Sequence, residues 1–199
     1  MGVETNDVCH QCNSGWMSQL EHQTRSTLAP MITGSDLSLD NDHQIAVSKW
    51  AYKTAMIFDL IGNGRSGSYF NDQDRHEFEV SKAVPTPSRV HIYMAAFNGP
   101  HVASAIDYRV YFNIRDNPRL RDAEAYCSTI SVGHLVLQVF VVRHFEDLRR
   151  VKPPFSTTEW EMATVCLWPV RNSLVRWPPD RVLDQAGYSA LIDRWRPNG

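Results

Sequence analysis

The chain has 199 residues, of which 43% are hydrophobic and 21% are charged, so its composition is globular and excludes a disordered chain. Its 20 basic and 22 acidic residues give a net charge of −2, which excludes the strongly basic surface of many nucleic-acid binders and allows only a local basic patch. No apolar run approaches the roughly 18 residues of a membrane span, and no signal-peptide pattern follows Met1. We therefore expect no membrane partner and a cytoplasmic location with reduced thiols.

The first predicted helix runs from Asn13 to Leu28. Trp16 and Leu20 share one face of this helix with Leu28, which is the pattern of a helix that packs on a core. Pro30 follows, and proline removes a backbone donor, so we expect the helix to end there.

A second predicted helix begins at Asn41-x-x-Gln44, a capping-box pattern in which each side chain satisfies the other residue's backbone N–H. It continues through IAVSKWAYKTAMIFDLIG and stops at Gly62. Apolar residues lie on several of its faces, so we expect this helix to be central to the core, with Trp50 and Ile57 buried.

Beyond a loop and a short helix capped near Asn71 or Asp72, the hydrophobic period changes to two, which is typical of strands. Gly133-His134 lies between two of these strands and predicts a hairpin turn of type II′. The predicted strands are Val90–Phe97, Ile106–Arg115, Ala125–Val132, Leu135–His144 and Trp160–Trp168.

The C-terminal part predicts one helix that begins at Asp180 and ends at Gly187, followed by a last turn or two. The predicted fold class is α+β, with N-terminal helices packed on an antiparallel sheet of about five strands and short C-terminal helices. We divide the chain into residues 1–30, which hold a half zinc knuckle and its helix, and residues 31–199, an α+β domain of unknown function.

The candidate metal site is the CxxC pair Cys9 and Cys12, whose spacing lets one tight turn direct both thiols at a single ion. Structural zinc needs four ligands, and the pair supplies two. Candidates for the others are His10, His22, His43, Cys127 and Cys166. The alternative is that both cysteines are reduced thiols packed under Trp16.

The stretch VCHQCNSGWMSQLE, residues 8–21, resembles the second zinc knuckle and final helix of a bacterial and phage protein group related to HNH endonucleases, with the signature CxxCN.GWM..LE. SKWAYKTAMIFDL, SVGHLVLQVF and the LWP and RWPP segments resemble the remainder of that group, so the resemblance covers most of the chain. It implies a structural Zn²⁺ at Cys9 and Cys12. It also implies that Asn13 is the last letter of HNH, beside a catalytic divalent metal.

An HNH site also needs a histidine general base and a further metal ligand, which the family carries before the knuckle. Residues 1–8, MGVETNDV, contain no histidine and no first CxxC. The resemblance therefore implies a protein directed at nucleic acid, with DNA as a partner, that is inactive as an isolated chain. A protein partner could supply the missing elements. The alternative is a non-catalytic module that binds a protein or a ligand.

Three other patterns have ordinary structural interpretations beside functional ones. GNGRSG, residues 62–67, follows a helix rather than a strand, so it predicts a loop and not a dinucleotide site. The acidic residues of 71–79 could bind a hard cation, but Asp72 and Asp74 also suit the first turn of a helix. Trp177 and Trp195 lie among arginines and could stack on bases, although packing of the chain end against the core is the favoured interpretation.

Overall fold

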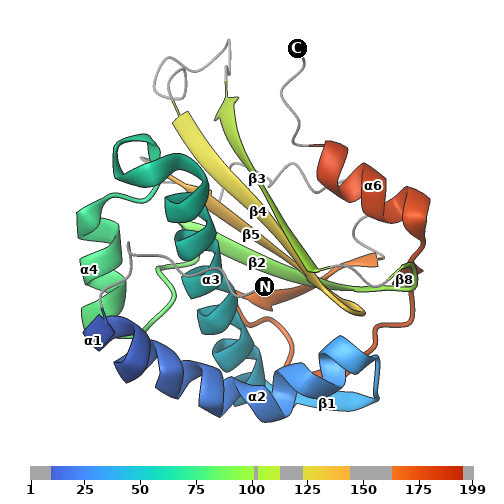
Figure 1. Ribbon diagram of the computed structural model, residues 1–199. Helices are drawn as coiled ribbons and strands as arrows, with labels where there is room; N and C mark the ends of the chain where they lie inside the picture. The colour runs from blue at the N-terminus through green and yellow to red at the C-terminus, as the bar shows by residue number, and fades with distance from the viewer. Residues whose placement is uncertain (1–9, 101–102, 113–122, 144–162, 195–199) are drawn as a thin grey trace.

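The computed structural model describes residues 10–100, 103–112, 123–143 and 163–194 (Figure 1). A helical run with a kink at Gly15 opens it, made of α1 (His10–Cys12), η1 (Asn13–Met17) and α2 (Ser18–Thr33). The expectation that Pro30 ends this helix is wrong, because Pro30 lies inside α2. Gly34 ends it instead, in the left-handed conformation with φ +76°, and donates its N–H to the Met31 carbonyl.

A short strand and a long helix follow, β1 (Leu37–Asp40) and α3 (Asn41–Gly67). The N-cap is Asp40 rather than Asn41, since the Asp40 carboxylate accepts the His43 N–H at 2.9 Å. The helix also continues past Gly62 to Gly67, so the loop predicted for residues 62–67 is wrong.

The buried face of α3 differs from the predicted one. Val47, Ala51 and Ala55 have no exposed surface, whereas Trp50 and Ile57 are only half-buried. Their expected burial is therefore wrong, although α3 does form the centre of the core.

Helix α4 (Asp72–Ser81) begins where the sequence predicts. Asn71 accepts the Asp74 N–H at 2.8 Å, and the Asp74 carboxylate accepts the Asn71 N–H at 3.0 Å. This reciprocal pair is a capping box, and it places Asp72 and Asp74 in the first turn, where their negative charge favours the helix dipole.

The main sheet has the strand order β3-β4-β5-β2-β6, with β8 beside β2. Every pairing is antiparallel except that of β2 with β8. In the Gly133-His134 turn Gly133 has φ +57°, as a type II′ turn requires of its first residue. The strands are β2 (Val90–Phe97), β3 (Ala103–Phe112), β4 (Ala123–Val132), β5 (Leu135–Val142), β6 (Val165–Trp168) and β8 (Val182–Leu183).

The C-terminal part contains a strand that the sequence does not predict, β7 (Leu174–Trp177), which pairs with β1 in a separate two-stranded sheet. The prediction of a helix from Asp180 to Gly187 is wrong. The chain there forms β8, and α6 (Gln185–Asp193) begins only after Asp184, which caps it by accepting the Gly187 N–H at 2.8 Å.

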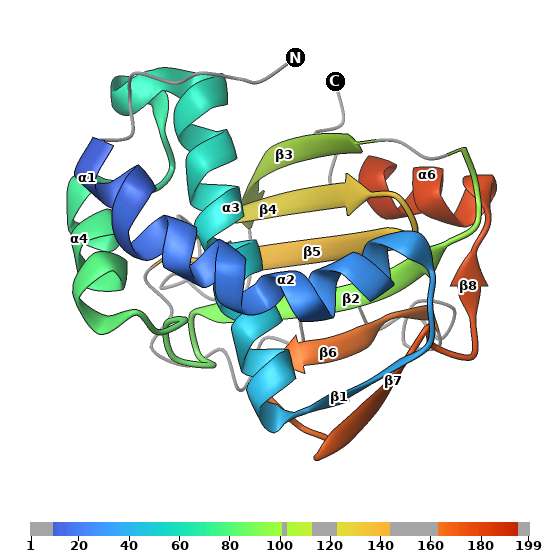
Figure 2. The same cartoon turned by 60° about the horizontal axis from the view of Figure 1, so that its bottom comes forward.

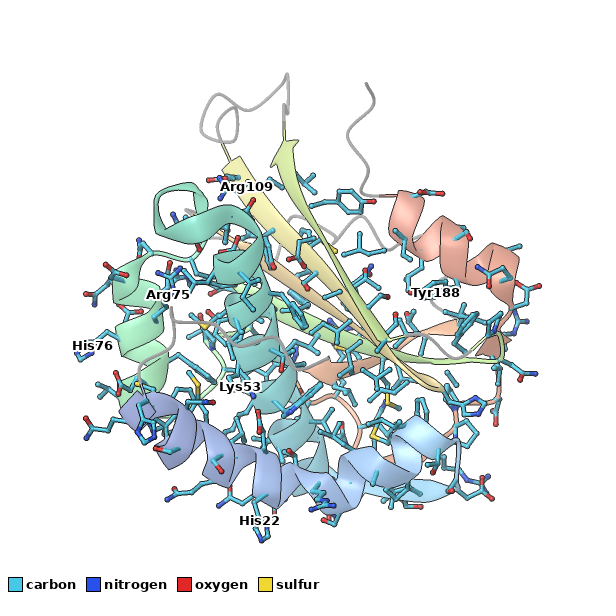
Figure 3. All side chains as sticks on the ribbon, viewed as in Figure 1. His22, Lys53, Arg75, His76, Arg109 and Tyr188 are labelled. Carbon is cyan, nitrogen blue, oxygen red and sulfur yellow. The ribbon has the colours of Figure 1, made fainter. Side chains whose placement is uncertain are left out.

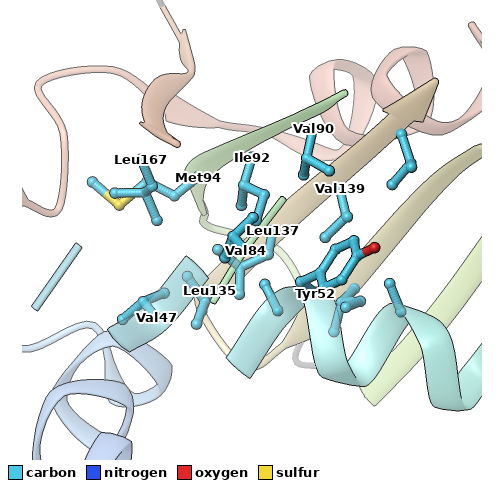
Figure 4. Packing of buried hydrophobic residues seen from close by; sticks show 14 of the residues in the cluster. Val47, Tyr52, Val84, Val90, Ile92, Met94, Leu135, Leu137, Val139 and Leu167 are labelled. Carbon is cyan, nitrogen blue, oxygen red and sulfur yellow. The ribbon is translucent and has the colours of Figure 1, made fainter. Parts of the chain in front are cut away.

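The described elements form three layers, with the sheet in the middle and helices on both of its faces (Figure 2). Helix α3 crosses one face, where it packs with Leu137, Val139 and their neighbours in the main core (Figure 4). Helix α6 packs on the opposite face against Phe97 and Val136. These layers confirm the α+β class. Among the described helices, none is long and apolar enough to cross a membrane.

Candidate functional site

The described part of the predicted knuckle lies at the start of the first helical run, beside α4. Cys12 is partly exposed, and its Sγ lies 3.6 Å from Glu79 Oε1. Asn13, the next residue, is exposed. It lies in η1, where Gly15 departs from helical geometry. Cys9 lies outside the described residues, so its pairing with Cys12 around zinc stays a prediction.

His10 lies with Cys12 in α1, where its Nδ1 is 3.5 Å from the Ser14 hydroxyl, whereas the other residues expected to complete a zinc site lie in different elements. His22 points away from the body of the molecule on the outer side of α2 (Figure 3), and His43 Nδ1 lies 2.7 Å from Asp40. Burial raises the pKa of Cys127 well above its usual range and that of Cys166 to about 11, which disfavours the thiolate that binds zinc. Within residues 10–194, as far as they are described, no three or more His, Cys, Asp or Glu side chains form a group that could hold a metal ion.

Residues 71–79, the other candidate for a cation, use their charges in α4 itself. Asp74 accepts from Arg143 at 2.7 Å and from Arg89 at 3.4 Å in addition to its capping bond. His76 points outward from the helix (Figure 3) and is 67% exposed. This arrangement agrees with the capping interpretation of Asp72 and Asp74.

A groove of about 200 Å³ runs beside the knuckle, between the first helical run, α3 and α4. Trp16 is its aromatic residue, and the indole packs edge-on against Phe78 with ring centroids 5.5 Å apart. The Lys82 ammonium lies 4.2 Å from the centre of the Trp16 ring. The lining residues are Trp16, Gln19, Leu20, Gln23, Lys49, Phe78 and Lys82.

Lys82, whose side chain lies over Trp16, has an unfavourable backbone conformation. Lys82 is the C-cap of α4 and has φ +50°, the left-handed conformation that glycine adopts far more readily. Among the described residues other than glycine, it is the one with a positive φ. Unusual backbone conformations of this kind cluster at binding sites, and this one places a cation on an aromatic face.

The groove combines three kinds of group that nucleic acids use. Lys49 and Lys82 bring positive charge, Gln19 and Gln23 bring amide donors and acceptors, and Trp16 brings an aromatic ring. Aromatic rings stack on bases whatever the sequence, and nearby cations contact phosphates. The arrangement can therefore hold a base and the phosphates on either side of it.

Trp16 packs against the main core, as its helical spacing predicts, but the sequence does not predict this groove. Lys49 and Lys82 stand in different predicted helices, and only the packing of α4 against α3 brings them to Trp16. Trp177, the C-terminal tryptophan considered for base stacking, is only 2% exposed and packs in the main core, so it is not available to a base. Trp195 lies outside the described residues.

Comparison with known proteins adds no relative, because no family model, no curated protein and no solved structure matches this chain.

Proposed function

We propose that this protein binds nucleic acid, with single-stranded DNA as the substrate class, at the groove that contains Trp16. The observation that carries the proposal is the Lys82 ammonium over the Trp16 ring, with Lys49 in the same groove. A stacked base would replace the Lys82 contact on the exposed part of the indole, and the displaced ammonium would pair with a phosphate.

The HNH resemblance supports the same placement. The signature CxxCN.GWM..LE contains both Asn13 and Trp16. The position that the family uses beside its catalytic metal and the aromatic wall of the groove therefore belong to one helical run. Glu21 of the signature accepts from the nearly buried Lys53 ammonium at 2.5 Å, which ties this run to α3. The residues of the signature thus place the knuckle and the groove on one helical run that is held to α3.

We propose a structural zinc ion at Cys9 and Cys12. The donor set fits, because Cys12 is a partly exposed thiol and the Glu79 carboxylate beside it is also a zinc ligand type. Bound zinc would fix the turn before Asn13 and supply folding free energy. Purified protein should contain close to one zinc per chain, and Cys12→Ser should lower that content sharply, while a folded protein without zinc would contradict the proposal.

The binding experiment measures fluorescence anisotropy of a labelled dT oligonucleotide at several salt concentrations. Trp16→Leu and Lys82→Gly should each weaken binding about 3–10-fold, because one removes the stacking surface and the other a phosphate contact. Lys82→Gly should also reduce the dependence of log K on log salt by about 0.7.

Two matched controls make the result specific. Arg176→Gln removes one exposed positive charge from β7, far along the chain from the groove, and should leave binding unchanged. Trp50→Leu removes a half-buried tryptophan from α3 without removing a groove residue. Equal losses in Arg176→Gln and Lys82→Gly would mean that binding is a general charge effect and would refute the groove as the site.

The alternative, a non-catalytic module that binds a protein or a ligand, has one observation in its favour. A second and larger cavity lies beside α4 and shares Phe78 with the groove. Its chemistry differs from that of the groove.

A further inference from the structure

The larger cavity has a volume of about 590 Å³ and lies between α4, the segment that follows it and α3. Pockets of this size hold small organic ligands. Phe78, Val80, Val84 and Pro85 give it apolar walls, and Val80 is 69% exposed at its surface. An apolar cavity of this kind favours a ligand with a ring or a branched hydrocarbon body.

Tyr52 gives the cavity a buried polar group. The residue is 3% exposed, and its ring is held edge-on by Phe70 and Phe78 at centroid distances of 5.6 and 5.1 Å. Its hydroxyl makes no hydrogen bond to any residue that the structure describes. The hydroxyl opens onto the cavity, where water can reach it, so a polar ligand atom there can take its hydrogen bond in place of water.

Burial and the nearby charges keep the Tyr52 hydroxyl protonated. Burial raises the pKa of Tyr52, and the carboxylates of Asp74 and Glu77 raise it further, whereas Arg89 lowers it. The hydroxyl therefore stays neutral and can either donate or accept a hydrogen bond. Arg143 also lowers the pKa of Tyr52, so two carboxylates and two guanidinium groups act on the hydroxyl. Asp74 pairs with both arginines, whereas Glu77 forms no ion pair with a described residue.

The two carboxylates are not equally available to a ligand. Asp74 already accepts from Arg143, Arg89 and the Asn71 backbone. Glu77 is exposed and accepts from Gln73 at 2.9 Å within the same helix, so it remains accessible from solvent. A cationic group on a ligand would find its partner at Glu77.

We propose that this cavity binds a small aromatic amine, whose ring lies against Phe78 and the other apolar walls. A polar ring substituent hydrogen-bonds to the Tyr52 hydroxyl, and the ammonium group lies near Glu77. This site goes beyond the proposed nucleic-acid binding and does not depend on it, because Phe78 is the one lining residue that the two sites share.

The test uses three probes with one 4-hydroxyphenyl body: tyramine as the cation, p-cresol as the neutral form and 4-hydroxyphenylacetate as the anion. Binding is measured by calorimetry and by ligand-observed NMR on the full chain. We expect tyramine to bind most tightly and the anion least. Tyr52→Phe keeps the ring contacts and removes only the hydroxyl, so it should weaken all three probes about 2–10-fold, the loss of one hydrogen bond.

Further variants separate the charge and the walls. Glu77→Gln should abolish the advantage of tyramine over p-cresol while leaving p-cresol binding unchanged. Val80→Ser should weaken every probe, whereas Val182→Ser, at an exposed valine on β8 outside the cavity, should not. Thermal unfolding of Tyr52→Phe at or above the wild-type temperature would exclude loss of fold as the cause.

The proposal is overturned if the three probes show no binding at millimolar concentration, or if Tyr52→Phe binds them as wild type does. Failure of the nucleic-acid proposal would appear instead as unchanged oligonucleotide binding in Lys82→Gly. The two failures are therefore distinguishable.

Discussion

Asp59 lies inside α3 with no exposed surface, and its carboxylate accepts several hydrogen bonds. Its oxygens accept the backbone N–H groups of Tyr69 and Phe70 at 3.1 and 3.0 Å, together with the Asn63 amide at 3.1 Å and the Ser68 hydroxyl. These bonds tie the middle of α3 to the segment that follows it. A single side chain thus holds the turn that leads into α4.

We expect Asp59→Asn to lower the free energy of unfolding by about 2–4 kcal/mol, because the new amide hydrogens would face backbone donors and leave one of them unsatisfied. Urea unfolding measures the loss. Asp36→Asn, an exposed aspartate before β1, is the matched control and should change stability by less than about 0.5 kcal/mol. Equal stability of the two variants would contradict the role given to Asp59.

His91 should make the protein sensitive to mild acid. Burial in β2, helped by Arg171, lowers the pKa of His91 from 6.5 to about 4. As the pH falls below about 6.5 the unfolded chain binds a proton that the folded chain does not, so the free energy of unfolding falls until the pH reaches about 4.

The expected loss between pH 7 and pH 4.5 is about 1–3 kcal/mol from this one group. His91→Gln removes the titration, so its stability should decline less than that of the wild type over the same range. Urea unfolding at several pH values compares the two slopes. Parallel slopes would show that His91 does not contribute.

At the scale of elements, the β4–β5 turn is fixed by the end of α2. The His134 N–H donates to the Ile32 carbonyl at 2.9 Å, and a Cβ on Gly133 would come within 2.3 Å of that same oxygen. Gly133 also has φ +57°, which favours glycine. Both the conformation and the space at this position therefore exclude a side chain.

Gly133→Ala should destabilise the protein by about 2–4 kcal/mol, through backbone strain and the clash with Ile32. Gly62→Ala is the informative comparison, because a Cβ at Gly62 meets nothing within 4 Å and the residue lies inside α3. It should raise stability by about 0.5–1 kcal/mol. Thermal unfolding of both variants tests the contrast, and a Gly133→Ala protein as stable as wild type would refute it.

The elements that the sequence predicts well are those whose local signals agree with their surroundings. Strand β2 and the capping box at Asn71 follow from periodicity and from paired side chains close together in the chain. Helix α3 continues beyond Gly62 against its local propensity, in the region where Asp59 holds the chain at 68–70. Such long-range contacts are not encoded in local spacing.

The same limit explains the errors at Pro30 and Asp180. A proline inside a helix forfeits one hydrogen bond, and α2 tolerates this loss while it packs on α3. Asp180 and Asp184 are both suitable caps, and the pairing of β8 with β2 decides between them. The groove is a further case, since its lysines meet only after α4 has packed.

At the scale of the whole molecule, a series of aromatic contacts connects the first helical run to the sheet. Trp16 contacts Phe78, Phe78 contacts Tyr52, Tyr52 contacts Phe70, and Phe70 contacts Tyr126, with centroid distances of 5.5, 5.1, 5.6 and 5.2 Å. Phe78 is thus a wall of both the groove and the larger cavity. Substitution of Phe78 would disturb both sites, whereas Lys82 and Tyr52 report on one site each.

The isolated chain should not cleave DNA. Among its residues the HNH resemblance assigns a catalytic position only to Asn13, and a carboxamide cannot accept the proton of the attacking water. Loss of a general base alone costs on the order of 10²–10⁴-fold in rate. Plasmid and oligonucleotide assays with magnesium, manganese, nickel or zinc should show no cutting. Robust cleavage that disappears in Asn13→Ala would contradict this expectation and would require another base.

The pairing of β1 with β7 has a consequence for the order of events during synthesis. Leu39 of β1 is fully buried, and its partner across the ladder is Val175. Chains fold as they emerge from the ribosome, so α2, β1 and α3 are made long before the strand that completes their packing. Until β7 emerges, residues 37–40 have no ladder partner and their backbone groups and apolar side chains stay open to chaperones and to other nascent chains.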